Sequence, residues 1–190
     1  KLKVEVVTDS VTVPFGMDFL PDGKMIVTDR TMGAMLLVNT QSGEKQYIQD
    51  VPIPLTDTDG GMSDVLVHPD YKKNGWIYFS YSIGDTSHCT LVVDRAKLEN
   101  VRLVERERIF TVLPYAEGPY HFGGRLLIQN GYLFITTGEH FDLMDSAQSI
   151  SNHFGKVIRI FEDGKIPTDN PFVNTVRARP EIWSYGHRNP

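Results

Sequence analysis

One pattern recurs three times in the sequence, and it restricts the fold to one built from β-hairpins. Each copy has a short apolar strand, a turn containing Pro-Asp or Asn-Gly, and a second strand rich in β-branched and aromatic residues. The copies cover residues 16–29, 61–81 and 124–137. The corresponding turn positions are Pro21, Pro69 and Gln129, which lie 48 and then 60 residues apart. Hairpins repeated every roughly 40–60 residues are typical of a β-propeller.

Further strands between the hairpins bring each repeat to about four strands, the number in a propeller blade. They are predicted at residues 34–38, 90–94, 108–112 and 156–161, with long loops at 138–153 and 165–179. No segment has helical periodicity. The predicted fold class is therefore all-β, a β-propeller of which this chain supplies about three blades. A β-sandwich with coincidental hairpins is the alternative.

A fourth copy of the repeat begins at Gly186, so we interpret residues 1–190 as the N-terminal half of a single propeller domain. Three blades do not close a ring, and an open ring exposes strand edges and apolar blade faces. We therefore expect a C-terminal half, either from the same polypeptide or from a second chain, or else self-association.

Composition and charge exclude several classes of protein. The net charge is −5 and the Lys and Arg residues are scattered, which argues against a nucleic-acid-binding surface. No apolar run approaches the ~18 residues of a membrane span. Cys89 is the single cysteine, so an intrachain disulfide is excluded and a buried strand position is expected. The first residue is Lys1 rather than Met, which we interpret as loss of a signal peptide or of an expression segment; we expect a periplasmic or secreted location.

Two short runs are not needed for a hydrophobic core and are therefore candidates for function. His121 is closely followed by Gly123 and Gly124, which leave little bulk beside its imidazole. Arg188 and Asn189 offer a fixed cation and a neutral amide, which suit a ligand rich in carbonyl and carboxylate groups. These runs predict a base and a ligand clamp. The alternatives are a structural histidine, a buried salt bridge between blades for Arg188, and a turn amide for Asn189.

The polar loop 138–153 carries five residues of types that bind metals: Glu139, His140, Asp142, Asp145 and His153. Their spacing matches no standard ligand pattern, so we interpret them as solvated loop polarity, and no metal ligand is assigned in this chain. His68 and His187 are expected to be structural. No Gly-x-Gly-x-x-Gly run follows a strand and no βαβ alternation occurs, which argues against a nicotinamide site. No Gly-x-Ser-x-Gly run supports a serine hydrolase.

Five runs in the sequence jointly resemble one family. They lie at residues 14–23, 60–71, 121–126, 155–160 and 183–190. In this order they are similar to the glucose/sorbosone dehydrogenase family, soluble aldose dehydrogenases that use pyrroloquinoline quinone (PQQ). The resemblance implies a six-bladed propeller with the quinone near the central axis beside a calcium ion. The implied reaction oxidises the C1 hydroxyl of an aldose to the lactone, with hydride transfer to PQQ. The calcium ligands are implied to lie beyond Pro190.

The resemblance also assigns roles to residues. It implies that His121 is the general base and that Arg188 and Asn189 contact the quinone. Asp59 stands where the family commonly has a glutamine near the cofactor, which makes it a candidate cofactor-binding residue; the alternative is a position in a plain loop with Asp57, Gly60 and Gly61. A carboxylate there would repel an anionic quinone unless a cation intervened. Tyr120 replaces an aspartate that precedes the base in some members, so any acid that orients His121 must come from elsewhere. The alternative function is a non-catalytic binding module of the same fold.

Overall fold

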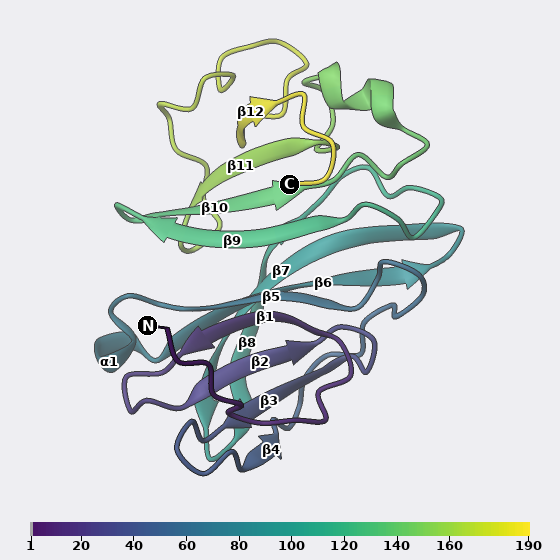
Figure 1. The fold of residues 1–190 in the computed structure, drawn as a ribbon. Coiled ribbons are helices and arrows are strands. Elements are labelled where there is room, and N and C mark those ends of the chain that lie inside the picture. Colours follow the sequence, from purple (N-terminus) through teal and green to yellow (C-terminus); the bar gives the residue numbers. More distant parts are fainter. Residues whose placement is uncertain (1) are drawn as a thin grey trace.

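The computed structural model describes residues 2–190, which form three four-stranded antiparallel sheets of consecutive strands (Figure 1). The first blade contains β1 (Pro14–Phe19), β2 (Met25–Asp29), β3 (Ala34–Val38) and β4 (Lys45–Tyr47). The second contains β5 (Met62–Val67), β6 (Trp76–Asp85), β7 (His88–Glu99) and β8 (Arg102–Thr111). The third contains β9 (Gly123–Gln129), β10 (Tyr132–Thr137), β11 (Lys156–Phe161) and β12 (Ile182–Tyr185). The predicted propeller blades are confirmed, and the sandwich alternative is wrong.

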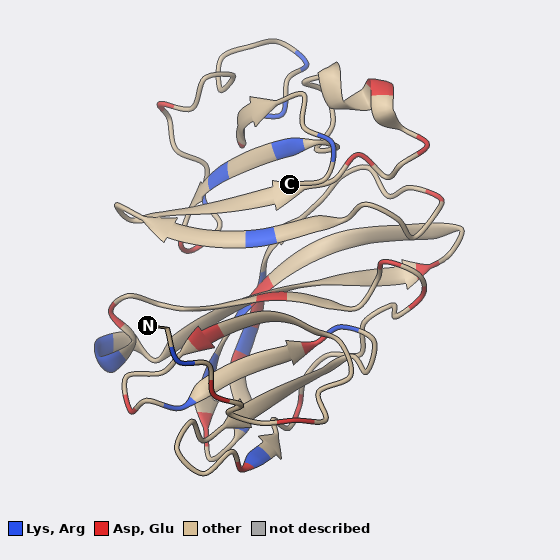
Figure 2. Cartoon of the chain, in the orientation of Figure 1, with Lys and Arg blue, Asp and Glu red and all other residues tan. Residues whose placement is uncertain are grey.

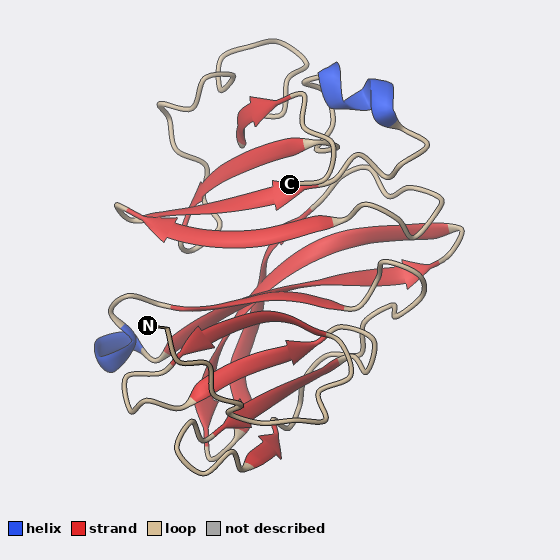
Figure 3. Cartoon of the chain, in the orientation of Figure 1, coloured by secondary structure: helices blue, strands red, loops and turns tan. Residues whose placement is uncertain are grey.

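The strands differ from the prediction mainly in length. β7 and β8 extend well beyond the predicted segments 90–94 and 108–112. β4 and β12 were not predicted, since segments of three and four residues are too short to show a period. Two short helical turns, α1 (Tyr71–Asn74) and η1 (Met144–Gln148), lie in connections between strands (Figure 3). The second of them lies inside the predicted loop 138–153.

Two hydrophobic cores hold the three blades together face to face. The core between the first and second blades includes Ile26, Met35 and Phe79. The core between the second and third includes Tyr78 and Leu133. Tyr78 and Phe79 are neighbours on β6 and lie in different cores because successive strand side chains point to opposite faces. The middle blade is thus buried on both sides. Cys89 is also buried, on β7, as the sequence predicts.

The first strand of each blade has an irregular register at its start, and a hydroxyl from the second strand accepts a backbone N–H there. The N–H···Oγ distances are 2.8 Å from Gly16 to Thr28, 3.0 Å from Asp64 to Ser80 and 3.0 Å from Arg125 to Thr136. The bulged strand starts are therefore satisfied in the same way in all three blades.

The same three hydroxyls donate to the backbone of the segment that follows each blade. The distances are 2.8 Å from Thr28 to the Ser63 carbonyl, 2.6 Å from Ser80 to the Gly124 carbonyl and 2.8 Å from Thr136 to the Pro190 carbonyl. Ser63 and Gly124 begin the second and third blades. Pro190 receives the equivalent bond from the third.

Acidic and basic residues are mixed on the first two sheets, whereas the strands of the third carry only the basic residues Arg125, Lys156 and Arg159, without a continuous basic stripe (Figure 2). No helix among residues 2–190 is long and apolar enough to cross a membrane.

Candidate functional site

The predicted functional residues meet at the edge where the first strands of the blades begin. Asp59 precedes β5, His121 precedes β9, and Arg188 and Asn189 follow β12. Asp59 Oδ2 accepts the backbone N–H of His121 at 3.2 Å. Asn189 Oδ1 accepts the N–H of Gly123 at 2.9 Å. These bonds join three segments that lie far apart in the sequence.

His121 forms its strongest side-chain contact with Glu139. The Nδ1 atom lies 2.6 Å from Glu139 Oε1, and the side chains are 14% and 2% exposed. An ionised carboxylate can only accept, so this contact places the proton on Nδ1 and leaves Nε2 as the acceptor. Among residues 2–190 no group hydrogen-bonds to Nε2. His121 is therefore held in the tautomer that a general base requires.

Glu139 is a candidate site residue that the sequence pattern did not indicate. It is 1% exposed, so the interpretation of solvated loop polarity is wrong for it. His140 and His153 are also 1% exposed, and the interpretation is wrong for them too. Glu139 reaches the base because of the register between β10 and β9, in which Thr137 pairs with Gly123. Glu139 lies two positions after Thr137 and His121 lies two positions before Gly123, so the antiparallel pairing places them side by side. It supplies the orienting acid that Tyr120 does not.

The backbone around the base is strained. His121, His140 and Phe141 have φ angles of 48°, 58° and 57°, in the left-handed region that bulky residues rarely adopt. Such angles cost of order 1–3 kcal/mol each and cluster at functional sites. Gly138 is required as a glycine, because a Cβ there would collide with the His121 carbonyl oxygen and approach Asn189 Oδ1 at 2.7 Å.

Arg188 is exposed, and its guanidinium has no ion pair or hydrogen bond within residues 2–190. Its Cζ lies 6.0 Å from the centroid of the Phe141 ring, and its backbone carbonyl accepts the Glu139 N–H at 2.9 Å. The buried salt bridge proposed as an alternative for Arg188 is not what the structure shows. The alternative for Asn189 was a turn amide that satisfies backbone groups, and its Oδ1 does so by accepting the Gly123 N–H.

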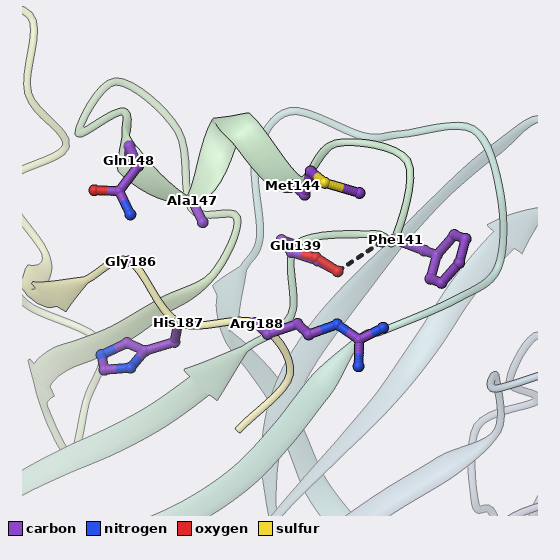
Figure 4. Close-up of a pocket in the computed structure, with 8 residues that line it drawn as sticks. All are labelled: Glu139, Phe141, Met144, Ala147, Gln148, Gly186, His187 and Arg188. Carbon is purple, nitrogen blue, oxygen red and sulfur yellow. Dashed lines mark hydrogen bonds between the residues drawn. The ribbon is translucent and has the colours of Figure 1, made fainter.

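A cavity of about 220 Å³ lies beside these residues (Figure 4). It is lined by Glu139, Phe141, Met144, Ala147, Gln148, Gly186, His187 and Arg188. Arg188 extends toward Phe141 while His187 points the other way, as alternation along an extended segment predicts (Figure 4). His187 Nε2 lies 2.8 Å from Ser184 Oγ, which supports a structural role.

The remaining buried histidines take part in local structure. His68 contacts Glu162 at 2.8 Å, and His153 contacts Glu181 at 2.9 Å. Burial lowers the pKa of His140, whose Nδ1 faces the Gly118 carbonyl oxygen. No group of three or more His, Cys, Asp or Glu among residues 2–190 is placed to hold a metal ion.

The residues present fit an anionic quinone on one side of the site. The unpaired guanidinium of Arg188 borders the cavity, and a planar fork of donors suits carboxylate and quinone oxygens. Glu139 also lines the cavity, and its Oε2 is buried without a hydrogen-bond partner, so this side of the cavity suits an anionic quinone only with a cation between them. Asp59 contributes a carboxylate that is already bonded to the His121 backbone.

Comparison with known proteins gives a consistent result. The chain is 34% identical to the aldose sugar dehydrogenase YliI of Escherichia coli (strain K12), over 100% of this chain and 52% of that protein. It matches the PQQ-bound structure of an aldose sugar dehydrogenase from Streptomyces coelicolor at 25% identity with a TM-score of 0.84, covering 98% of this chain and 54% of the other. It is also 31% identical to human Hedgehog-interacting protein over 68% of this chain and 21% of that protein.

The chain thus spans about half the length of the dehydrogenases that it matches. The sequence profile of the Glucose / Sorbosone dehydrogenase family covers residues 11–190. Since this is nearly the whole chain, the chain belongs to the glucose/sorbosone dehydrogenase family.

Proposed function

We propose that this chain, together with the remaining blades of its propeller, oxidises the C1 hydroxyl of aldose sugars to the lactone. The observation that carries the proposal is the His121–Glu139 pair, which leaves His121 Nε2 without a protein partner. Glu139, which holds the base, also lines the cavity that the unpaired guanidinium of Arg188 borders. His68 and His153, by contrast, have protein partners at both ring nitrogens.

In the proposed reaction, His121 Nε2 accepts the proton of the C1 hydroxyl, and Glu139 stabilises the imidazolium that results. The hydrogen on C1 leaves as hydride, so the sugar loses two electrons and two hydrogens. PQQ, when bound, would supply the hydride acceptor, which no protein side chain can provide. Arg188 would hold the quinone and offset negative charge on its oxygens.

Asn189 would contact the quinone through its Nδ2, since its Oδ1 holds Gly123. Asp59 has its clearest role in fixing the His121 backbone, and any contact with the quinone would need a cation between them. The proposal includes calcium bound by residues outside this chain. A periplasmic or secreted location is a separate proposal, which fractionation of the native cells tests.

The test uses the full-length protein supplied with PQQ and calcium, with an artificial electron acceptor and a panel of aldoses. Replacing His121 by Gln should lower kcat by about 10²–10⁴-fold and leave PQQ affinity nearly unchanged. Replacing Arg188 by Gln should weaken PQQ binding in a titration, whereas Arg102→Gln on β8 should not. Wild-type turnover in the His121 variant would rule out the assignment of the base.

A non-catalytic binding module is the second candidate, and the similarity to Hedgehog-interacting protein favours it. A propeller mouth can bind a partner without chemistry. Absence of both PQQ binding and aldose oxidation in the full-length wild-type protein would support this candidate over the enzyme.

A further inference from the structure

We propose that Tyr120 and Phe141 form an aromatic platform that holds the sugar ring beside His121; this rests on the proposed oxidation of aldoses. The two rings have centroids 6.2 Å apart and planes inclined at 50°. The Phe141 ring also meets the His121 imidazole edge-on, with centroids 5.2 Å apart and an interplanar angle of 78°. The Phe141 ring thus lies next to the predicted base, and the Tyr120 ring lies next to Phe141.

Both rings of the platform keep accessible surface. Tyr120 is 42% exposed and Phe141 is 46% exposed. By contrast, the Phe122 ring between them in sequence is 4% exposed and packs edge-on against His140. Phe122 therefore packs into the core, while the rings of Tyr120 and Phe141 remain accessible at the site. Apolar rings with accessible surface suit the C–H groups on one face of a pyranose.

The backbone holds Phe141 in this position at a cost. Its φ of 57° is strained for a bulky residue, and its N–H donates to Glu139 Oε1 at 3.0 Å. The same oxygen contacts His121 Nδ1. One carboxylate oxygen thus fixes the position of the base and that of the ring beside it. Strain of this kind persists where the surrounding bonds impose it, and here it sets an exposed ring at a fixed place next to the base.

The geometry favours a sugar over the quinone as the occupant. The base must touch the hydroxyl that it deprotonates, so the ligand next to His121 is the substrate. Rings inclined at 50° form a corner, whereas a flat quinone is best held between parallel faces. The cation that suits the quinone, Arg188, lies 6.0 Å from the centroid of Phe141.

The experiment measures sugar binding without turnover. Full-length protein loaded with PQQ is mixed with methyl β-D-glucopyranoside, whose blocked C1 oxygen prevents oxidation at C1. Saturation-transfer NMR with irradiation of aromatic protein resonances should give signals from the ring protons of the sugar. Phe141→Leu and Tyr120→Leu should each raise the Kd of the sugar by about 3- to 10-fold, and Tyr120→Phe should have little effect.

The matched control is Phe161→Leu, which changes an exposed aromatic residue stacked on Tyr132 at the far end of the third blade. It should leave the Kd of the sugar unchanged. Unaltered sugar binding in both leucine variants overturns the platform, and so does a loss of PQQ affinity with sugar affinity preserved, which would assign the rings to the quinone. If a leucine variant fails to fold, the Phe141→Met variant replaces it. Sugar contact without any aldose oxidation would support the platform and reject the proposed reaction.

Discussion

At the scale of single residues, the Glu139 carboxylate determines how His121 can act. Glu139→Gln keeps an oxygen that can accept from both His121 Nδ1 and the Phe141 N–H, but it removes the charge. We expect kcat to fall by about 10- to 10⁴-fold with little change in melting temperature, because the imidazolium loses its counter-charge. Steady-state kinetics and thermal melts of the full-length protein test this. The control is Glu99→Gln at the exposed end of β7, and equal kinetics in the two variants would contradict the role of Glu139.

Lys156 on β11 makes a different prediction, about pH. Its ammonium is fully buried and donates to the carbonyl oxygens of Ser146, Ala147 and Phe154, which ties η1 to the third blade. Burial lowers the pKa of Lys156 from 10.5 to about 8. Between these two values the unfolded chain keeps a proton that the folded chain has released. The contribution of Lys156 to the free energy of unfolding therefore rises with pH in that window.

Lys156→Met provides the reference for this effect, because it removes the titrating group. The free energy of unfolding of the wild type, relative to this variant, should increase by about 1–3 kcal/mol between roughly pH 7.5 and roughly pH 10. Urea denaturation of both full-length proteins at the two pH values measures it. A difference that stays constant or decreases would show that the pKa of Lys156 is not lowered by folding.

The sequence identified part of the site at this scale. It predicts four site residues, and the structure brings them to one edge of the blades: His121, Arg188, Asn189 and Asp59. The contact between Glu139 and His121 could not be predicted, because it depends on the register between β9 and β10. The Asn-Gly turn sets that register for most of the hairpin, but the irregular pairing at the start of β9 shifts the register by one residue. Side-chain burial in the loop 138–153 is likewise set by tertiary packing, which local polarity does not reveal.

At the scale of elements, each blade has a hydroxyl on its second strand that bonds the start of the first strand, a repeated feature that the sequence pattern did not indicate. Ser80 is fully buried, accepts the Asp64 N–H and donates to the Gly124 carbonyl. Ser80→Ala should lower the free energy of unfolding by about 1–3 kcal/mol, since two buried backbone groups lose their partner. Urea unfolding measures this, with the exposed Ser151→Ala as control. Equal stabilities would show that water or relaxation replaces the serine.

The strands themselves were largely predictable. Hairpins with β-branched second strands and clear turn residues, such as β9 and β10, gave strong signals. β4 and β12 are outer strands of three and four residues whose positions depend on pairing with β3 and β11 rather than on their own sequence. Their short length removed the only local evidence for them.

At the scale of the whole molecule, the exposed apolar side chains show where the blades lack neighbours. Among residues 62–111, the middle blade, no large apolar side chain is exposed. The first blade exposes Met17 and Phe19, and the third exposes Trp183 and Tyr185. The Thr136 hydroxyl also donates to the Pro190 carbonyl, which is the bond that marks the start of the next blade in the other two cases. These features support a propeller that continues beyond the three blades described.

We therefore predict that residues 1–190, produced alone, do not form a stable active monomer. Their open blade faces should lead to aggregation, self-association or pairing with a separately produced remainder of the propeller. They should also lack dehydrogenase activity. Within residues 2–190, Arg188 is the only cationic side chain that lines the cavity, and one guanidinium is too little to hold an anionic quinone. Size-exclusion chromatography combined with an aldose oxidation assay in the presence of PQQ and calcium tests both points, and adding the remainder should restore a defined complex. A monodisperse monomer that oxidises aldoses would contradict the requirement for further blades, because it would show that three blades suffice to hold the quinone and the sugar.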